Sequence, residues 1–156
     1  MEPPAAITTA HDHDRVSATA SVAAAPSEVF EFLRRPANHA RLSGDRSVRE
    51  AATGDEVLGP GSRFGMKMKI GVPYRVTSRV VEFEPDRVLA WSHFAGHRWR
   101  WELTPTEGGT RVTETFDMAT ARFPPALRLL GYPKRHLDNV TGSVANLVAH
   151  FAPTGD

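Results

Sequence analysis

One carboxylate, Glu114, stands out as a residue whose position could give it chemistry. In the segment from Thr110 to Met118, polar and apolar residues alternate as in a half-buried strand, and Glu114 falls on the apolar face with Val112 and Phe116. An isolated buried charge is costly, so a carboxyl group there must be paired, hydrated or neutral, and unpaired burial would raise its pKa. Glu114 could therefore orient a ligand or act as an acid/base. Alternatively, it lies at the sheet rim, where it reaches solvent or pairs with an arginine.

A second titratable residue, His93, falls in the segment from Val88 to Phe94 and shares the face of Trp91. A histidine changes charge near neutral pH, so His93 could be a pocket base or a hydrogen-bond donor near Glu114. It could also be a satisfied structural residue or an exposed one. Glu114 and His93 are the two candidates for a catalytic role.

The inward faces of the alternating segments carry apolar side chains that would suit an aromatic or polycyclic ligand. Methionine adapts to varied apolar shapes, and tryptophan offers a large apolar area with one N–H donor. On the last helix, Asn139 lies beside the apolar stripe and could contact a ligand, whereas His136 is expected to face solvent. The alternative for each residue is that it simply fills a closed core. The candidate ligand-binding set is Phe64, Met66, Met68, Trp91, His93, Trp99, Trp101, Glu114, Phe116 and Asn139.

Strands and helices that would position these residues follow from hydrophobic periodicity and from glycine and proline breaks. A strand is predicted first, then two short helices, a series of strands and two C-terminal helices. The predicted strands are 16–24, 47–53, 63–70, 74–83, 88–94, 98–104 and 110–118, and the predicted helices are 26–35, 38–42, 124–130 and 134–150.

The arrangement of these elements predicts an α+β fold. Successive later strands have short connections, so they should pair antiparallel. Each strand has one polar and one apolar face, and the apolar side of so large a sheet must be covered. The only element long enough to cover it is the last helix, with its apolar stripe from Leu137 to Phe151. We therefore expect a curved sheet of about seven antiparallel strands wrapped around a long C-terminal helix, with two short helices after the first strand.

Composition excludes several classes of protein. The chain of 156 residues fits one domain and contains no cysteine, so disulfides and thiolate chemistry are excluded. With 19 basic and 18 acidic residues the net charge is +1, which implies no nucleic-acid partner. Nucleotide-binding glycine motifs, the GxSxG elbow of hydrolases and the HExxH zinc motif do not occur, so neither a cofactor nor a metal is expected.

The first fourteen residues have no hydrophobic period and are expected to be a disordered tail, with one ligand-binding domain over residues 15–152. The tail contains His11-Asp12-His13-Asp14, whose side chains could ligate a divalent metal. A tail supplies no outer shell of residues to orient such ligands, so we expect it to be solvated. No apolar stretch is long enough to span a membrane and no signal-peptide pattern occurs, which predicts a cytoplasmic location.

Several segments resemble the START-like (SRPBCC) superfamily, in particular its polyketide cyclase/dehydrase and lipid-transport group. They are the strand end and helix start from Val22 to Phe30, the stretch from Arg79 to Pro85 with Trp91, and the last hairpin, Trp99 to Leu103 with Gly108 to Thr115. The resemblance covers nearly the whole chain, from about Val16 to Phe151. It implies a helix-grip fold with a cavity between the sheet and the last helix. The superfamily includes carriers, receptors, aromatases and cyclases that share no catalytic residue set, so no site residue is carried over.

The leading functional hypothesis is a carrier or sensor that binds an apolar or aromatic, lipid- or polyketide-like small molecule in that cavity. The alternative is a cyclase, aromatase or dehydratase that uses Glu114, His93 or both as acid/base. A second alternative is a protein-interaction module without a ligand. The chain could be a monomer or a homodimer.

Overall fold

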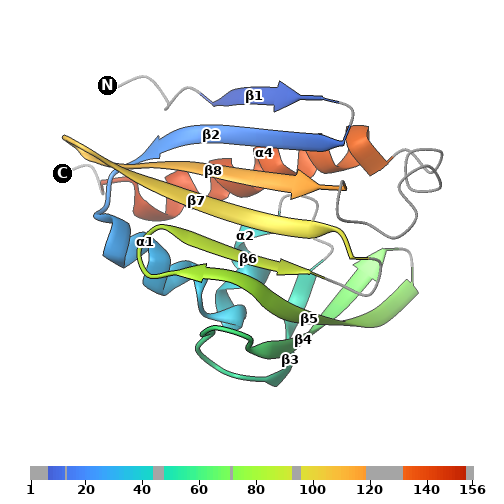
Figure 1. The fold of residues 1–156 in the computed structure, drawn as a ribbon. Helices are drawn as coiled ribbons and strands as arrows, with labels where there is room; N and C mark the ends of the chain where they lie inside the picture. Colours follow the sequence, from blue (N-terminus) through green and yellow to red (C-terminus); the bar gives the residue numbers. More distant parts are fainter. Residues whose placement is uncertain are drawn as a thin grey trace.

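A curved antiparallel sheet forms the frame of the molecule (Figure 1). The computed structural model describes residues 7–12, 14–43, 48–70, 72–92, 96–118 and 132–153. Within them the sheet has eight strands in the order β1-β2-β8-β7-β6-β5-β4-β3. The strands are β1 (Thr8–His11), β2 (Arg15–Val22), β3 (Val48–Gly54), β4 (Arg63–Ile70), β5 (Val72–Glu84), β6 (Val88–Ser92), β7 (Arg98–Thr106) and β8 (Gly109–Asp117).

Helices cover the concave face of this sheet. The described helices are α1 (Pro26–Leu33), η1 (Pro36–Asn38), α2 (His39–Leu42) and α4 (Tyr132–Phe151). The long α4 packs mainly on β2 and β8, as Figure 1 shows, whereas the short α2 lies between β3 and α4. The side chain of Asn146 joins the two helices by donating a hydrogen bond to the carbonyl of Leu42, with a distance of 3.1 Å. No described helix is both long and apolar enough to cross a bilayer.

The alternation of side chains explains how α4 approaches the sheet. On β2, every second residue faces inward and is buried, and two of these residues, Ala18 and Ala20, are small. The apolar stripe of α4, with Val140 and Val144 fully buried, packs over them. The helix-grip arrangement and the long C-terminal helix predicted from sequence are therefore confirmed.

The expected disordered tail is wrong for Thr8–His11, which form the edge strand β1 and pair antiparallel with β2. All four residues are exposed, so no hydrophobic period marks the strand, and the ladder with β2 holds it instead. The carboxylate of Asp12 accepts hydrogen bonds from the backbone N–H groups of Asp14 and Arg15, at 2.9 and 2.8 Å, and so shapes the turn into β2. Asp12 thus has a structural role.

Two other predicted features fall outside the described residues, namely His13 of the possible metal motif and the helix 124–130. The predicted strand 47–53 is confirmed as β3, although its pairing with β4 contains irregularities. At the β7–β8 hairpin, Gly109 has a φ of 153°, and a Cβ there would overlap the carbonyl oxygen of Val22. This close approach requires glycine.

Candidate functional site

The carboxyl group of Glu114 lies in the interior between the sheet and α4. Glu114 lies on β8 opposite Trp101 of β7 and Ala18 of β2, and it is only 4% exposed. A side-chain hydrogen bond joins it to Ser143 of α4. The ion pairs among the described residues do not include it. The sequence left two positions open for Glu114. The structure places it in the interior and not at the sheet rim or in an ion pair with an arginine.

Burial dominates the electrostatics of this group. Loss of hydration raises the pKa of Glu114 well above its ordinary value, and the hydrogen bond from Ser143 offsets only part of that rise. The side chain is thus disposed to remain a neutral carboxylic acid under conditions where exposed glutamates are ionised. A neutral acid can donate a hydrogen bond or a proton to a polar atom placed beside it.

A row of aromatic side chains crosses the concave face of the sheet, two residues along the strands from the position of Glu114. Trp91, Trp99 and Phe116 occupy paired positions on β6, β7 and β8, so their side chains project to the same side. The rings of Trp99 and Phe116 are 4.7 Å apart between centroids. Phe116 follows Glu114 by two residues on β8, which places the row about 7 Å from the carboxyl-bearing position.

A buried histidine on α2 closes one end of this row. The ring of His39 stacks on Trp91 with a centroid distance of 4.7 Å and an interplanar angle of 15°, and Phe64 meets both rings edge-on. The Nε2 atom of His39 is 2.9 Å from the carbonyl oxygen of Leu33. Because a carbonyl only accepts, Nε2 carries the hydrogen in the neutral ring. Burial lowers the pKa of His39 to about 4, so this histidine is uncharged at neutral pH.

Two further histidines lie at the other end of the row. His136 of α4 stacks on Phe116 with a centroid distance of 3.9 Å and meets Trp99 edge-on. His97, just before β7, packs against Phe116 at 5.0 Å, and burial lowers its pKa to about 4. The expectation that His136 faces solvent is wrong, because the residue is buried. His136 precedes Val140 by one helical turn and shares its inward face.

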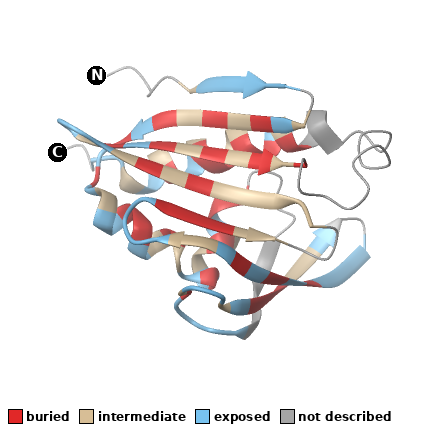
Figure 2. Ribbon diagram, in the orientation of Figure 1, coloured by how far each residue is buried: buried red, intermediate tan, exposed pale blue. Residues whose placement is uncertain are grey.

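Two members of the aromatic row are only partly shielded from solvent. Toward the other end of the same strands, Leu89 and Leu103 are fully buried. Trp91 and Trp99, although they face inward, are only half-buried, and Figure 2 shows the corresponding ends of β6 and β7 in the intermediate colour. A large inward-facing aromatic surface that keeps partial exposure is suited to receive an apolar molecule.

The structure places the predicted binding residues as follows. Phe64, Met66, Trp101, Glu114, Phe116 and Asn139 are buried, Met68, Trp91 and Trp99 are half-buried, and His93 lies outside the described residues. The structure brings four of these rings together beside Glu114. Phe64 contacts Trp91, Trp91 lies opposite Trp99 on the neighbouring strand, and Trp99 contacts Phe116. Their role in ligand binding stays a prediction.

The sequence reasoning missed three polar residues of this interior: His39, His97 and Ser143. Two of them carried a usable signal. His97 has the same parity as Trp99 and Trp101, and Ser143 follows Asn139 by one helical turn. His39 carried none, because its contact with Trp91 joins segments that are far apart in sequence.

Known proteins resemble this chain along most of its length. The family model described as polyketide cyclase / dehydrase and lipid transport matches residues 13–152. An uncharacterized protein of Mycobacterium tuberculosis is 40% identical over 146 residues, and the match covers 88% of this chain and 64% of the relative. The chain therefore spans less than two thirds of the length of that relative.

Solved structures share the fold. A protein from Rhodobacter sphaeroides has a TM-score of 0.69 at 21% identity, and the match covers 94% of this chain and 98% of that one. The di-domain ARO/CYC StfQ from the steffimycin biosynthetic pathway has a TM-score of 0.66 at 20% identity, with coverage of 88% of this chain and 50% of that one. At these identities the likeness is one of fold. Together with the family match, it shows that the chain belongs to the polyketide cyclase/dehydrase and lipid-transport family of the START-like superfamily.

Proposed function

We propose that the protein binds an apolar, aromatic small molecule between the concave face of the sheet and α4, as a carrier or sensor. The observation that carries this proposal is the aromatic row, in which Trp91 and Trp99 face inward yet remain half-buried. Flat indole and phenyl surfaces at paired strand positions would stack against a planar ligand.

Glu114 and Ser143 would supply the polar end of the same site. A neutral carboxyl group can donate a hydrogen bond to a carbonyl or phenol oxygen of the ligand, which an ionised carboxylate cannot do. A few polar groups in a mainly apolar site fix the orientation of a ligand without requiring a charge on it. We therefore expect a ligand with at least one oxygen near one end of an apolar ring system.

Native mass spectrometry of the purified protein, followed by denaturing extraction, would detect a bound molecule. A fluorescence titration with the apolar dye N-phenyl-1-naphthylamine would measure binding directly. Trp99→Ala should weaken dye binding at least about five-fold, since loss of one aromatic contact costs roughly 1 kcal/mol or more. Val81→Ala, at an exposed position of β5, is the control. Absence of both a co-purified species and dye binding would contradict the proposal.

A second function, that of a cyclase, aromatase or dehydratase acting on a polyketide-like substrate, is favoured by one specific observation. Glu114 is an interior acid held near its neutral form, which is the state that a general acid needs before it protonates a substrate oxygen. The similarity in fold to an ARO/CYC protein is compatible with this function. Under this proposal, Glu114→Gln retains dye binding but abolishes turnover. Unchanged turnover in that variant would remove Glu114 from the mechanism.

A further inference from the structure

The β4–β5 hairpin extends past the neighbouring strand of the sheet. Strand β5 runs from Val72 to Glu84 but pairs with β6 only from Arg79 onward. Among the described residues, the first part of β5 is therefore paired only with β4, over a length of about 20 Å. Figure 1 shows this end of the hairpin projecting beyond β6.

Exposure of the inward-facing side chains rises toward the tip of this hairpin. On the inward face of β5, Ser78 is 1% and Val76 is 8% exposed, whereas Tyr74 is 37% and Val72 is 69% exposed. Val72 is the most exposed large hydrophobic residue in the part of the chain that the structure describes. An apolar side chain that is mostly exposed adds little to the core and suits a contact with another apolar phase.

The opposite face of the same hairpin is cationic. The segment from Ser62 to Val81 contains five basic residues and no acidic one. In the register, Lys69 lies opposite Pro73, Lys67 opposite Arg75, and Arg63 opposite Arg79.

The positive charge on this face is mostly not neutralised. None of the ion pairs between described residues includes Arg63, Lys69, Arg75 or Arg79. Lys67 lies opposite Glu50 of β3 in the register, so the four other cations are the ones available to an anionic surface.

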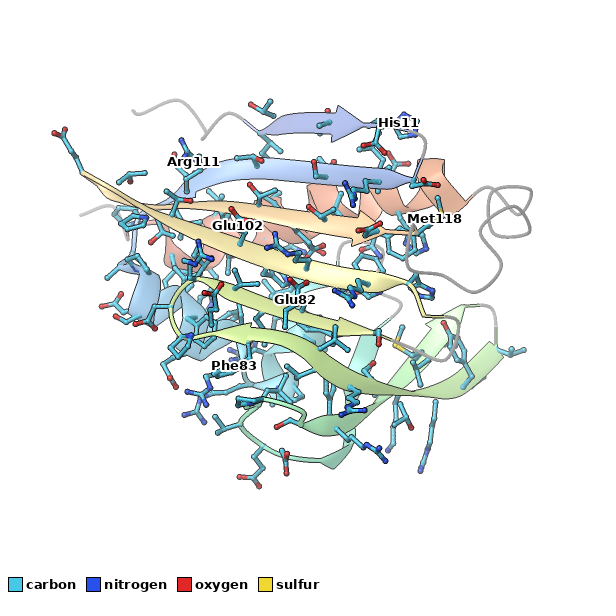
Figure 3. The ribbon with its side chains drawn as sticks, viewed as in Figure 1. His11, Glu82, Phe83, Glu102, Arg111 and Met118 are labelled. Carbon is cyan, nitrogen blue, oxygen red and sulfur yellow. The ribbon has the colours of Figure 1, made fainter. Side chains whose placement is uncertain are left out.

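The rest of the outer face differs in its charge. Arg98 and Arg100 of β7 form ion pairs with Glu82, and Arg100 also pairs with Glu102. Figure 3 shows Glu82 on β5 and Glu102 on β7, with β6 between these two strands. Among the described outer-face cations, those without an ion pair are therefore concentrated on the hairpin, and Arg111 of β8 is a single exposed cation far from it. The whole chain has a net charge of only +1.

We propose that the tip of the β4–β5 hairpin docks on the surface of an anionic phospholipid bilayer. Lys69 is level with Pro73 beside the tip, and Arg75 lies two residues, or about 7 Å, farther back. Apolar groups of interfacial elements enter a bilayer by about 5–10 Å, so Val72 reaches the acyl boundary while Lys69 and Arg75 lie at the level of the phosphates. An acidic soluble protein matches the cations but offers no apolar layer for Val72. This docking site is separate from the interior site and does not depend on what that site binds.

Vesicle flotation with the intact protein tests the proposal. Vesicles of phosphatidylcholine alone are compared with vesicles containing phosphatidylglycerol, at low and high salt. The wild-type protein should float with the anionic vesicles only, and less at high salt. Lys69→Glu and Arg75→Glu should each weaken binding at least about five-fold and together at least about 25-fold. The matched charge reversal is Arg111→Glu, at an exposed position that Figure 3 places at the far end from the hairpin, and it should bind like the wild type.

A second pair of variants tests the apolar contribution of Val72 to vesicle binding. Val72→Ser should weaken binding to anionic vesicles about five-fold, and Val81→Ser, which alters another exposed valine of β5, should leave it unchanged. The proposal is overturned if the wild type does not float with anionic vesicles at low salt, or if Arg111→Glu loses as much binding as Lys69→Glu. It is also overturned if soluble polyglutamate binds as tightly as the vesicles and Val72→Ser makes no difference, since the surface would then recognise an acidic protein. All variants change exposed residues, and a circular dichroism melt verifies that they fold.

Discussion

Replacing Glu114 with glutamine should make the protein more stable at neutral pH, although the side chain is buried and hydrogen-bonded. The folded state holds the pKa of this carboxyl well above the ordinary value of 4.5 that applies in the unfolded chain. Below that value both states are protonated and the group contributes no pH dependence. As the pH rises, the unfolded state releases the proton while the folded state retains it, so stability falls until the pH passes the folded-state pKa.

The size of the effect follows from a difference of one proton between the two states. The slope approaches about 1.4 kcal/mol per pH unit, which corresponds to roughly 3–5 °C in Tm per pH unit for a domain of this size. Glutamine does not titrate and can keep the hydrogen bond to Ser143, so Glu114→Gln should match the wild type near pH 4.5 and exceed it increasingly at higher pH.

The assay is thermal unfolding followed by circular dichroism at half-unit steps from pH 4.5 to 8, with the difference in Tm between variant and wild type plotted against pH. Contributions from histidines are common to both proteins and cancel in the difference. Glu107→Gln, at the exposed turn between β7 and β8, should give a flat difference near zero. A flat difference for Glu114→Gln as well would refute the argument that burial keeps this carboxyl neutral.

Three further predictions concern stability. Burial lowers the pKa of His39 to about 4, so below pH 6.5 the unfolded state takes up a proton that the folded state does not bind. As the pH is lowered from 6.5 to 4, the free energy of unfolding should therefore fall by up to about 1.4 kcal/mol per pH unit. His39→Gln should reduce that slope in urea titrations. Phe116→Ala should cost about 3–5 kcal/mol in chemical denaturation because it removes a fully buried ring that contacts Trp99 and His136, and a loss below 1 kcal/mol would contradict its packing. Gly109→Ala should destabilise by more than about 2 kcal/mol through overlap with Val22, whereas Gly108→Ala, with open space around the added Cβ, should melt like the wild type.

Local sequence patterns predicted the sheet well because each main strand has one face in the core. Alternation placed Glu114 with Phe116 on the inward side of β8, and both are buried. The same rule could not find β1, whose four residues are all exposed. An edge strand of this kind is held by backbone hydrogen bonds to β2, which leave no trace in hydrophobicity.

The interior site was predictable only in part, since its polar members come from different elements. The pairing of Trp91 with Trp99 follows from adjacent strands, whereas the stacking of His39 on Trp91 depends on how α2 packs across the sheet. Likewise, the hydrogen bond between Glu114 and Ser143 depends on the rotation of α4 about its axis. Such contacts are set by tertiary packing, and periodicity within one segment does not encode them.

The strand order also has a consequence for how the chain acquires its structure. Strand β2, near the start of the chain, has no partner among its immediate successors; it pairs with β8, and the hydroxyl groups of Thr19 and Thr113, 94 positions apart, meet at 2.8 Å. On a ribosome, the meander from β3 to β7 can assemble while β2 still lacks its main partner and the helix that covers it. The apolar face of β2 is thus exposed until β8 and α4 have been synthesised, and their docking on β2 closes a very long loop. Such a topology favours slow folding and makes nascent or C-terminally truncated chains substrates for chaperones.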